Sequence, residues 1–231
     1  MKHSADELIA IAHRYYMRGT CYDDSYRDTE EHRRLVDARI RAGTGANRDR
    51  WRALLDRIDE QFPGKGIQNR SIHLETGSSD GGYSAALYLS HPTDEYPHVV
   101  GFLISFLAPY YIVYSSRTVD DPDALAAHRA SKTSSVVGVL VGNEWKFIPA
   151  EEADPEFRTN ELKRFRRDLL SFDFSPEEAP VAEWIAREIE ATFNVERMPP
   201  EIGKIIVPEV STQLRLTEEA TIYDCLFTHD W

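Results

Sequence analysis

The chain has 231 residues, of which 42% are hydrophobic and 29% charged, and a formal net charge of −12 at pH 7. This composition is that of an ordinary globular protein with enough aromatic residues for a packed core. The charge is unevenly divided, because residues 1–70 carry a net +2 and residues 71–231 a net −14. An acidic body of this kind repels nucleic acid and anionic membranes and attracts basic surfaces. The composition therefore argues against nucleic acid and membrane as partners.

The cysteine content and the N-terminus both indicate a cytoplasmic protein. Two cysteines, Cys21 and Cys225, are too few for a disulfide framework or a four-cysteine zinc site. Asp6 and Glu7 lie too early in the sequence for a signal peptide. Cys225 lies in an apolar run, where we expect it to be part of the core.

Residues 1–62 are predicted to form three helices. The first begins at a capping box formed by Ser4 and Glu7. The second runs from about residue 29 to residue 41, and the third is capped by Asn47. The apolar residues of the third helix recur at helical spacing and are Trp51, Leu54, Leu55, Ile58 and Phe62.

Beyond a linker at residues 63–70, the apolar period changes from helical to extended. Strands are predicted at residues 71–76, 83–90, 98–107 and 110–118. The apolar run at 98–107 is nearly continuous, which is typical of a central strand buried on both faces.

The remaining predicted elements are a helix at 120–129, a hairpin of residues 136–141 and 144–148, a helix from Ser175, and short strands at 204–207 and 221–227. The helix from Ser175 is expected to bury Val181, Trp184, Ile185, Ile189 and Phe193. The predicted fold class is α+β, with N-terminal helices followed by a mostly antiparallel sheet with packed helices. We expect a single domain over residues 1–231, with a helical part at 1–62 and a sheet-containing body at 71–231.

The motifs of catalysis and cofactor binding are incomplete in this chain. Residues 82–86 lack the closing glycine of a nucleophile elbow, and residues 64–66 are too short for a phosphate-binding loop. His91 and His98 bracket a loop that contains two acidic residues, but their spacing matches no zinc rule. We therefore expect no catalytic residue, no metal and no cofactor, while a small cytoplasmic hydrolase or transferase with a dispersed active site stays the alternative.

Two basic clusters are candidates for nucleic-acid contact. They are Arg48, Arg50, Arg52 and Arg57, and then Lys163, Arg164, Arg166 and Arg167. Leu162, Phe165 and Leu169 interleave with the second cluster, which indicates the solvent-facing side of an amphipathic helix. The negative field of the chain also opposes phosphate binding.

Four stretches of the chain resemble a group of bacterial immunity proteins. These stretches are residues 198–203, 206–210, 220–227 and 106–114. Such proteins are encoded next to polymorphic toxins of the Rhs, contact-dependent or type VI kind. The resemblance implies an α+β fold and neutralisation of a cognate toxin by tight stoichiometric binding. No family site can be transferred residue by residue, because each immunity protein uses its own surface.

The acidic clusters complete this hypothesis, because an inhibitor needs a rigid scaffold and complementary charge rather than a reactive group. A basic toxin domain is the expected partner. The residues predicted to bind it are Asp120, Asp121, Asp123, Glu151, Glu152 and Asp154.

Overall fold

The computed structural model describes residues 2–19, 24–71, 81–90, 98–120, 136–141, 144–149, 166–212, 215 and 218–227. The contacts divide the chain into two compact units. The first unit comprises Met1–Ser115 and Ser171–Trp231, and the second comprises Ser116–Leu170. Folding of residues 1–231 as a single domain stays a prediction.

The predicted N-terminal helices are confirmed, with changes at their ends. Helix α1 (Ala5–Ala12) begins at the predicted Ser4–Glu7 capping box and ends well before Gly19. Helix α2 (Glu30–Gly43) follows a 3-10 turn, η1 (Asp24–Asp28), and Thr29 caps it.

Helix α3 (Gly45–Gln61) begins two residues before Asn47, so the predicted cap is wrong. The Asn47 amide donates instead to the carbonyl of Arg41 at 3.1 Å. Only Thr44 separates α2 from α3, and the positive φ of 54° at Gly45 lets the chain turn there, in a conformation that suits glycine.

The main sheet has the strand order β1-β2-β3-β4-β7, and β8 joins β4 in parallel. Its strands are β1 (Ile67–Asn69), β2 (Gly82–Tyr88), β3 (His98–Ser105), β4 (Tyr110–Asp120), β7 (Arg166–Ser171) and β8 (Glu196–Arg197). Strands β1, β2 and β3 pair antiparallel, with Ile67 opposite Leu87 and Tyr83 opposite Ile104. The chain is thus an α+β protein whose N-terminal helices precede the sheet. Residues 63–70, which were predicted to be a linker, include β1. This strand has only 3 residues, which is too few for an alternating pattern to be visible in the sequence.

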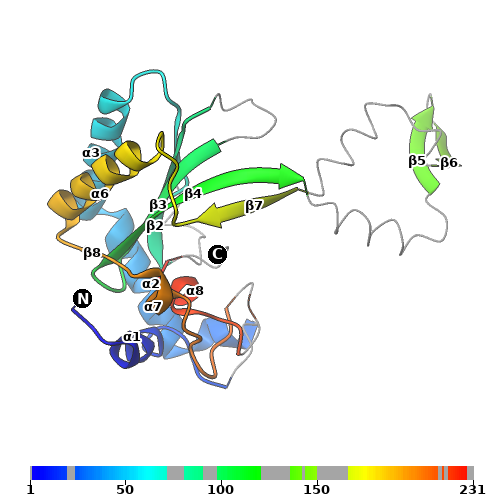
Figure 1. Ribbon diagram of the computed structural model, residues 1–231. Helices are drawn as coiled ribbons and strands as arrows, with labels where there is room; N and C mark the ends of the chain where they lie inside the picture. The colour runs from blue at the N-terminus through cyan, green and yellow to red at the C-terminus, as the bar shows by residue number, and fades with distance from the viewer. Residues whose placement is uncertain are drawn as a thin grey trace. The chain divides into compact units, whose positions relative to one another are not determined.

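Strands β3 and β4 are buried on both faces, as the apolar run predicts, and alternate residues enter two different cores. Phe102 and Ile104 face the α3/α6 core, which also holds Trp51, Leu54 and Ile58 of α3. Helices α3 and α6 (Ala179–Phe193) lie side by side over this face of the sheet (Figure 1).

The opposite face of the sheet packs on the C-terminal core. Leu103, Tyr110 and Ile112 enter this core together with α1 and the end of the chain. Helices α7 (Pro200–Gly203) and α8 (Ile222–Leu226) pack together there, close to α1 (Figure 1). Cys225 is fully buried in this core, as predicted, and burial raises its thiol pKa well above the usual value.

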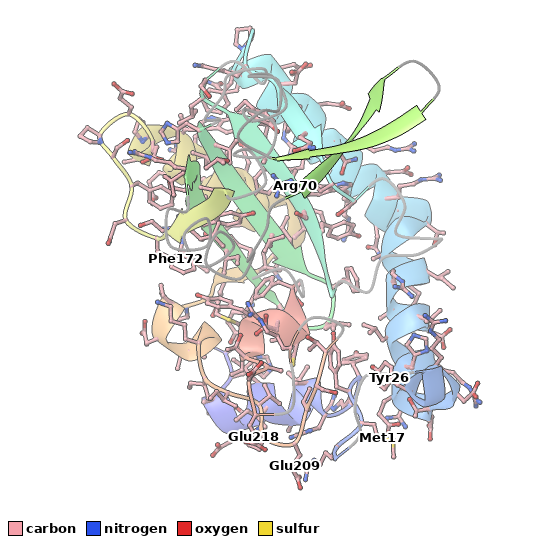
Figure 2. All side chains as sticks on the ribbon, turned by 90° about the vertical axis from the view of Figure 1, so that its right-hand side faces the viewer. Met17, Tyr26, Arg70, Phe172, Glu209 and Glu218 are labelled. Carbon is pink, nitrogen blue, oxygen red and sulfur yellow. The ribbon has the colours of Figure 1, made fainter. Side chains whose placement is uncertain are left out.

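The loop between α7 and α8 contributes Val207 and Val210 to the C-terminal core. The Gly19 N–H donates to the carbonyl of Glu209 at 2.8 Å, and the Glu209 N–H donates to the Glu218 carboxylate at 3.3 Å. Figure 2 shows these two glutamates near Met17, at the end of the first unit away from Arg70. The loop therefore ties the turn after α1 to the C-terminal part of the chain.

Three predictions for the C-terminal third are wrong. Residues 222–226 form α8 rather than a strand, and residues 204–207 contribute only an isolated bridge from Ile206 to Thr221. Arg166 and Arg167 belong to β7 and not to an amphipathic helix.

The late helix is confirmed as α6, but it begins at Ala179 and its buried face differs from the prediction. Its fully or nearly fully buried residues are Ala182, Ile185, Ala186 and Ile189. Val181, Trp184 and Phe193 are only partly buried at the edge of the α3/α6 core.

The second unit contains the predicted hairpin. Strands β5 (Val136–Val141) and β6 (Glu144–Pro149) pair antiparallel, with Val137 opposite Ile148. The predicted helix at 120–129 and the predicted strand at 71–76 lie almost entirely outside the described residues, except that Asp120 ends β4 and Ser71 follows β1.

Candidate functional site

The six residues predicted to bind a partner fall in the second unit, where few of them are described. The backbone of Asp120 ends β4. The other five, which are Asp121, Asp123, Glu151, Glu152 and Asp154, lie outside the described residues. The two acidic clusters therefore lie almost entirely outside the described residues. The binding surface stays a prediction.

The negative charge of the chain is not concentrated in the second unit as a whole. Residues 116–170 hold 9 Lys+Arg and 10 Asp+Glu, whereas residues 171–231 hold 4 and 13. Within the second unit the acids come first, because residues 120–156 hold 8 acids and 3 bases. Residues 157–167 then hold 5 bases and 1 acid. An acidic surface in this unit would therefore be local.

Three of the acidic side chains on α6 bind other side chains of the same unit. Glu188 accepts from Arg57 Nε at 2.7 Å, which joins α6 to α3. Glu183 pairs with Arg197 at 3.1 Å.

Glu190 accepts from the Tyr111 hydroxyl at 2.6 Å. Burial and the Glu190 bond raise the pKa of Tyr111 to about 12, so the phenol remains a donor at neutral pH. These contacts explain part of the acidic content of residues 171–231 as internal structure.

A serine, a histidine and a glutamate meet where α6 begins on the sheet. Glu178 is 1% exposed, and the same carboxylate oxygen contacts both the Ser115 hydroxyl and His98 Nε2. Its second oxygen accepts from the Ser175 N–H at 2.6 Å. Burial alone raises the pKa of this carboxyl, but the donated hydrogen bonds outweigh burial and lower it to about 2.

This cluster does not have the arrangement of a catalytic triad. In a triad the histidine lies between the nucleophile and the carboxylate and takes the proton of the serine. Here Glu178 lies between the two others, and Ser115 donates to the carboxylate rather than to His98. Ser115 is also only 3% exposed. The cluster therefore anchors the start of α6 to β3 and β4.

His98 is one of the two histidines considered for a metal site in the sequence. In the structure its ring contacts the Glu178 carboxylate. His91, Asp94 and Glu95 lie outside the described residues. Among the residues that are described, no group of three or more His, Cys, Asp or Glu side chains is placed to hold a metal ion. Over the same residues, no helix has both the length and the apolar character needed to cross a membrane.

A cavity of about 440 Å³ opens in the first unit, beside the turn between α2 and α3. Its polar lining includes Arg41, Asn47 and Arg50, and its apolar lining includes Tyr83, Phe106 and Phe193. In the sequence, Arg50 belongs to a basic cluster that is far from these aromatic residues. No local pattern could connect them, because the lining comes from four distant parts of the chain.

The four stretches on which the expected resemblance to immunity proteins rests converge on one place in the fold. Residues 106–114, 198–203, 206–210 and 220–227 all contribute to the C-terminal core. These residues therefore determine packing rather than chemistry.

Comparisons with known protein families, with curated proteins and with solved structures find no match to this chain.

Proposed function

We propose that this protein is an immunity protein, which neutralises a cognate bacterial toxin by tight stoichiometric binding through an acidic surface. The observation that carries the proposal is the net charge of −14 on residues 71–231 against +2 on residues 1–70. Opposite charge on a toxin raises the association rate by steering the encounter. The resemblance of the C-terminal stretches to immunity proteins supports the same function, and the proposal includes no catalytic step.

The proposed contact residues are Asp120, Asp121, Asp123, Glu151, Glu152 and Asp154. Their choice is supported by the internal partners of Glu183, Glu188 and Glu190 on α6. Those acids already bind groups of the first unit, whereas the acids of residues 120–156 outnumber the bases around them.

The direct test uses the product of the adjacent gene, which this proposal expects to encode a toxin. Size-exclusion chromatography and calorimetry should show a stoichiometric complex, and coexpression should protect cells from the toxin. When salt is raised from about 0.05 M to about 0.5 M, association should slow more than dissociation accelerates. If the wild-type protein fails to bind that gene product, the proposal is overturned in favour of a small hydrolase or transferase.

Charge reversal tests the surface itself. One variant changes Asp120, Asp121 and Asp123 to Lys, and a second changes Glu151, Glu152 and Asp154 to Lys. The control changes Asp173, Glu177 and Glu201 to Lys, which gives the same change in net charge. These three are exposed residues of the first unit.

At least one of the two test variants should weaken the complex more than the control, with an unchanged melting temperature. Equal effects from all three variants would show that only net charge matters. Full protection by both test variants would move the interface to the N-terminal helices.

A further inference from the structure

The cavity beside the α2–α3 turn has a cationic rim. Arg41, Asn47 and Arg50 line it and are exposed, and no Asp or Glu is among the described residues that line it. Two other arginines of these helices have acidic partners, since Arg34 pairs with Glu30 at 2.5 Å and Arg57 with Glu188 at 2.7 Å. In the described part of the chain, the guanidinium groups of Arg41 and Arg50 have no such ion pair. The rim therefore offers two guanidinium groups on a protein whose total charge is −12.

The floor of the cavity is aromatic and fixed in place. The Tyr83 ring stacks on the Trp51 ring, with ring centres 5.0 Å apart. The ring centres of Phe106 and Phe193 lie 5.9 Å and 5.6 Å from that of Tyr83. The Tyr83 hydroxyl donates to the carbonyl of Ala42 at 2.9 Å.

Burial raises the pKa of Tyr83 to about 12, although the positive charge of Arg50 opposes this rise. The floor therefore stays uncharged at neutral pH, and the charge of the cavity is that of its rim.

We propose that this cavity is a binding site for a small organic anion, with a planar or aromatic body on the floor and a phosphate or carboxylate group between Arg41 and Arg50. Guanidinium groups match the planar oxygen pairs of such anions and bind them through charge-assisted hydrogen bonds. Aromatic rings at the floor stack on flat ligands. The volume of about 440 Å³ falls within the usual range of small-molecule sites, roughly 300–1,000 Å³. The proposal is independent of toxin binding.

The test is a calorimetric titration of the full chain with four probes. 1-Naphthyl phosphate and 1-naphthoate carry both an aromatic body and an anionic group, inorganic phosphate carries only the charge, and 1-naphthol carries only the body. Whichever aromatic anion binds more tightly identifies phosphate or carboxylate as the preferred group. Each isolated part should bind at least about tenfold more weakly than that anion, since a charge-assisted hydrogen bond has a comparable effect.

Matched variants locate the site. Arg41→Gln and Arg50→Gln should each weaken binding of the aromatic anion by about tenfold. The control is Arg52→Gln, because Arg52 is also exposed on α3 but does not line the cavity. Phe193→Leu should weaken binding of the aromatic anions and leave that of inorganic phosphate unchanged. The proposal is overturned if neither aromatic anion binds saturably, if 1-naphthol binds as tightly, or if Arg52→Gln has the same effect as the other two arginine variants.

Discussion

The ring of Tyr223 lies against the α-carbon of Gly203. A β-carbon at Gly203 would come within 2.1 Å of Cε1 and Cζ of that ring, which is far closer than such atoms can approach. Gly203 ends α7, and Tyr223 belongs to α8. The absence of a side chain at position 203 therefore allows these two short helices to pack together in the C-terminal core.

We predict that Gly203→Ala destabilises the protein by roughly 1–3 kcal/mol, because the added methyl group displaces a buried ring. Urea denaturation followed by far-ultraviolet circular dichroism measures the loss. Lys204→Ala is the matched control, since Lys204 is the next residue and is exposed. Equal stability of the Gly203 variant and wild type would show that the Tyr223 ring moves aside without cost.

The Glu178 cluster predicts a dependence of stability on acid pH. Because the pKa of Glu178 is lowered to about 2 from 4.5, its ionised form stabilises the folded state. That contribution is fully present above pH 4.5 and is lost as the pH falls from 4.5 towards 2. The shift corresponds to a free energy on the order of 3 kcal/mol.

Glu178→Gln removes the charge and should lower the free energy of unfolding at pH 7 by a few kcal/mol. The difference from wild type should shrink as the pH falls towards 2. Glu177→Gln is the control, because Glu177 is adjacent in sequence but exposed. A constant difference between pH 7 and pH 2 would contradict ionisation of Glu178 as the cause.

The contact between Arg57 and Glu188 predicts a measurable coupling between α3 and α6. Arg57 also donates to Thr192 and to the carbonyl of Ala53, which holds the side chain in place. Because both charged side chains are partly exposed, a double-mutant cycle with alanine at each position should give about 0.5–1 kcal/mol. High salt should reduce this value. A coupling energy of zero at low salt would mean that the two helices pack through apolar contacts alone.

Alanine substitutions on α6 should lower the free energy of unfolding more at the buried Ile185 than at Trp184, which lies at the edge of the core. Ile185 is fully buried, so Ile185→Ala should cost roughly 2–5 kcal/mol. Trp184 is half-buried, and its ring packs in a T-shaped arrangement with that of Phe62, with ring centres 5.3 Å apart. Trp184→Ala should therefore cost less than the roughly 3–5 kcal/mol of a fully buried tryptophan. A greater loss from Trp184→Ala than from Ile185→Ala would contradict this placement.

Metal removal should not affect stability. Extensive dialysis against a chelator is expected to leave the melting temperature unchanged, because His98 contacts Glu178 in the structure. A fall of several degrees that one specific metal reverses would restore the metal site around His91 and His98.

The elements that the sequence predicted well carry strong local signals. Ser4 with Glu7 marks the start of α1, and the stripe from Trp51 to Ile58 marks the buried face of α3. Strands β2, β3 and β4 lie where the apolar period is extended, because burial on both faces requires a nearly continuous apolar run.

The misplaced elements show where local patterns compete. Residues 221–227 are rich in apolar residues typical of strands, yet Thr221 and Asp224 form a capping box that begins α8. The spacing of these two residues was visible in the sequence, and it is the same signal that located α1. Strand β1 has only 3 residues, so it depends on pairing with β2 rather than on its own pattern.

The candidate sites carry weaker sequence signals than the fold does. Arg50 belongs to a basic cluster in the sequence, but the cavity also needs Tyr83, Phe106 and Phe193, and only tertiary packing brings them together. Likewise, Ser115 and Glu178 are 63 residues apart and meet only because α6 packs on the sheet.

Strands β4 and β7 are neighbours in the sheet, although residues 121–165 lie between them in the sequence. The chain therefore leaves the sheet and returns to it at adjacent positions. Connections of this kind tolerate large changes in length and sequence, because the strands that they join stay paired. We therefore expect residues 121–165 to tolerate changes in sequence with little effect on the pairing of β4 and β7. In the proposed immunity role this stretch holds most of the toxin-binding acids, so new specificities can evolve there while both hydrophobic cores stay the same.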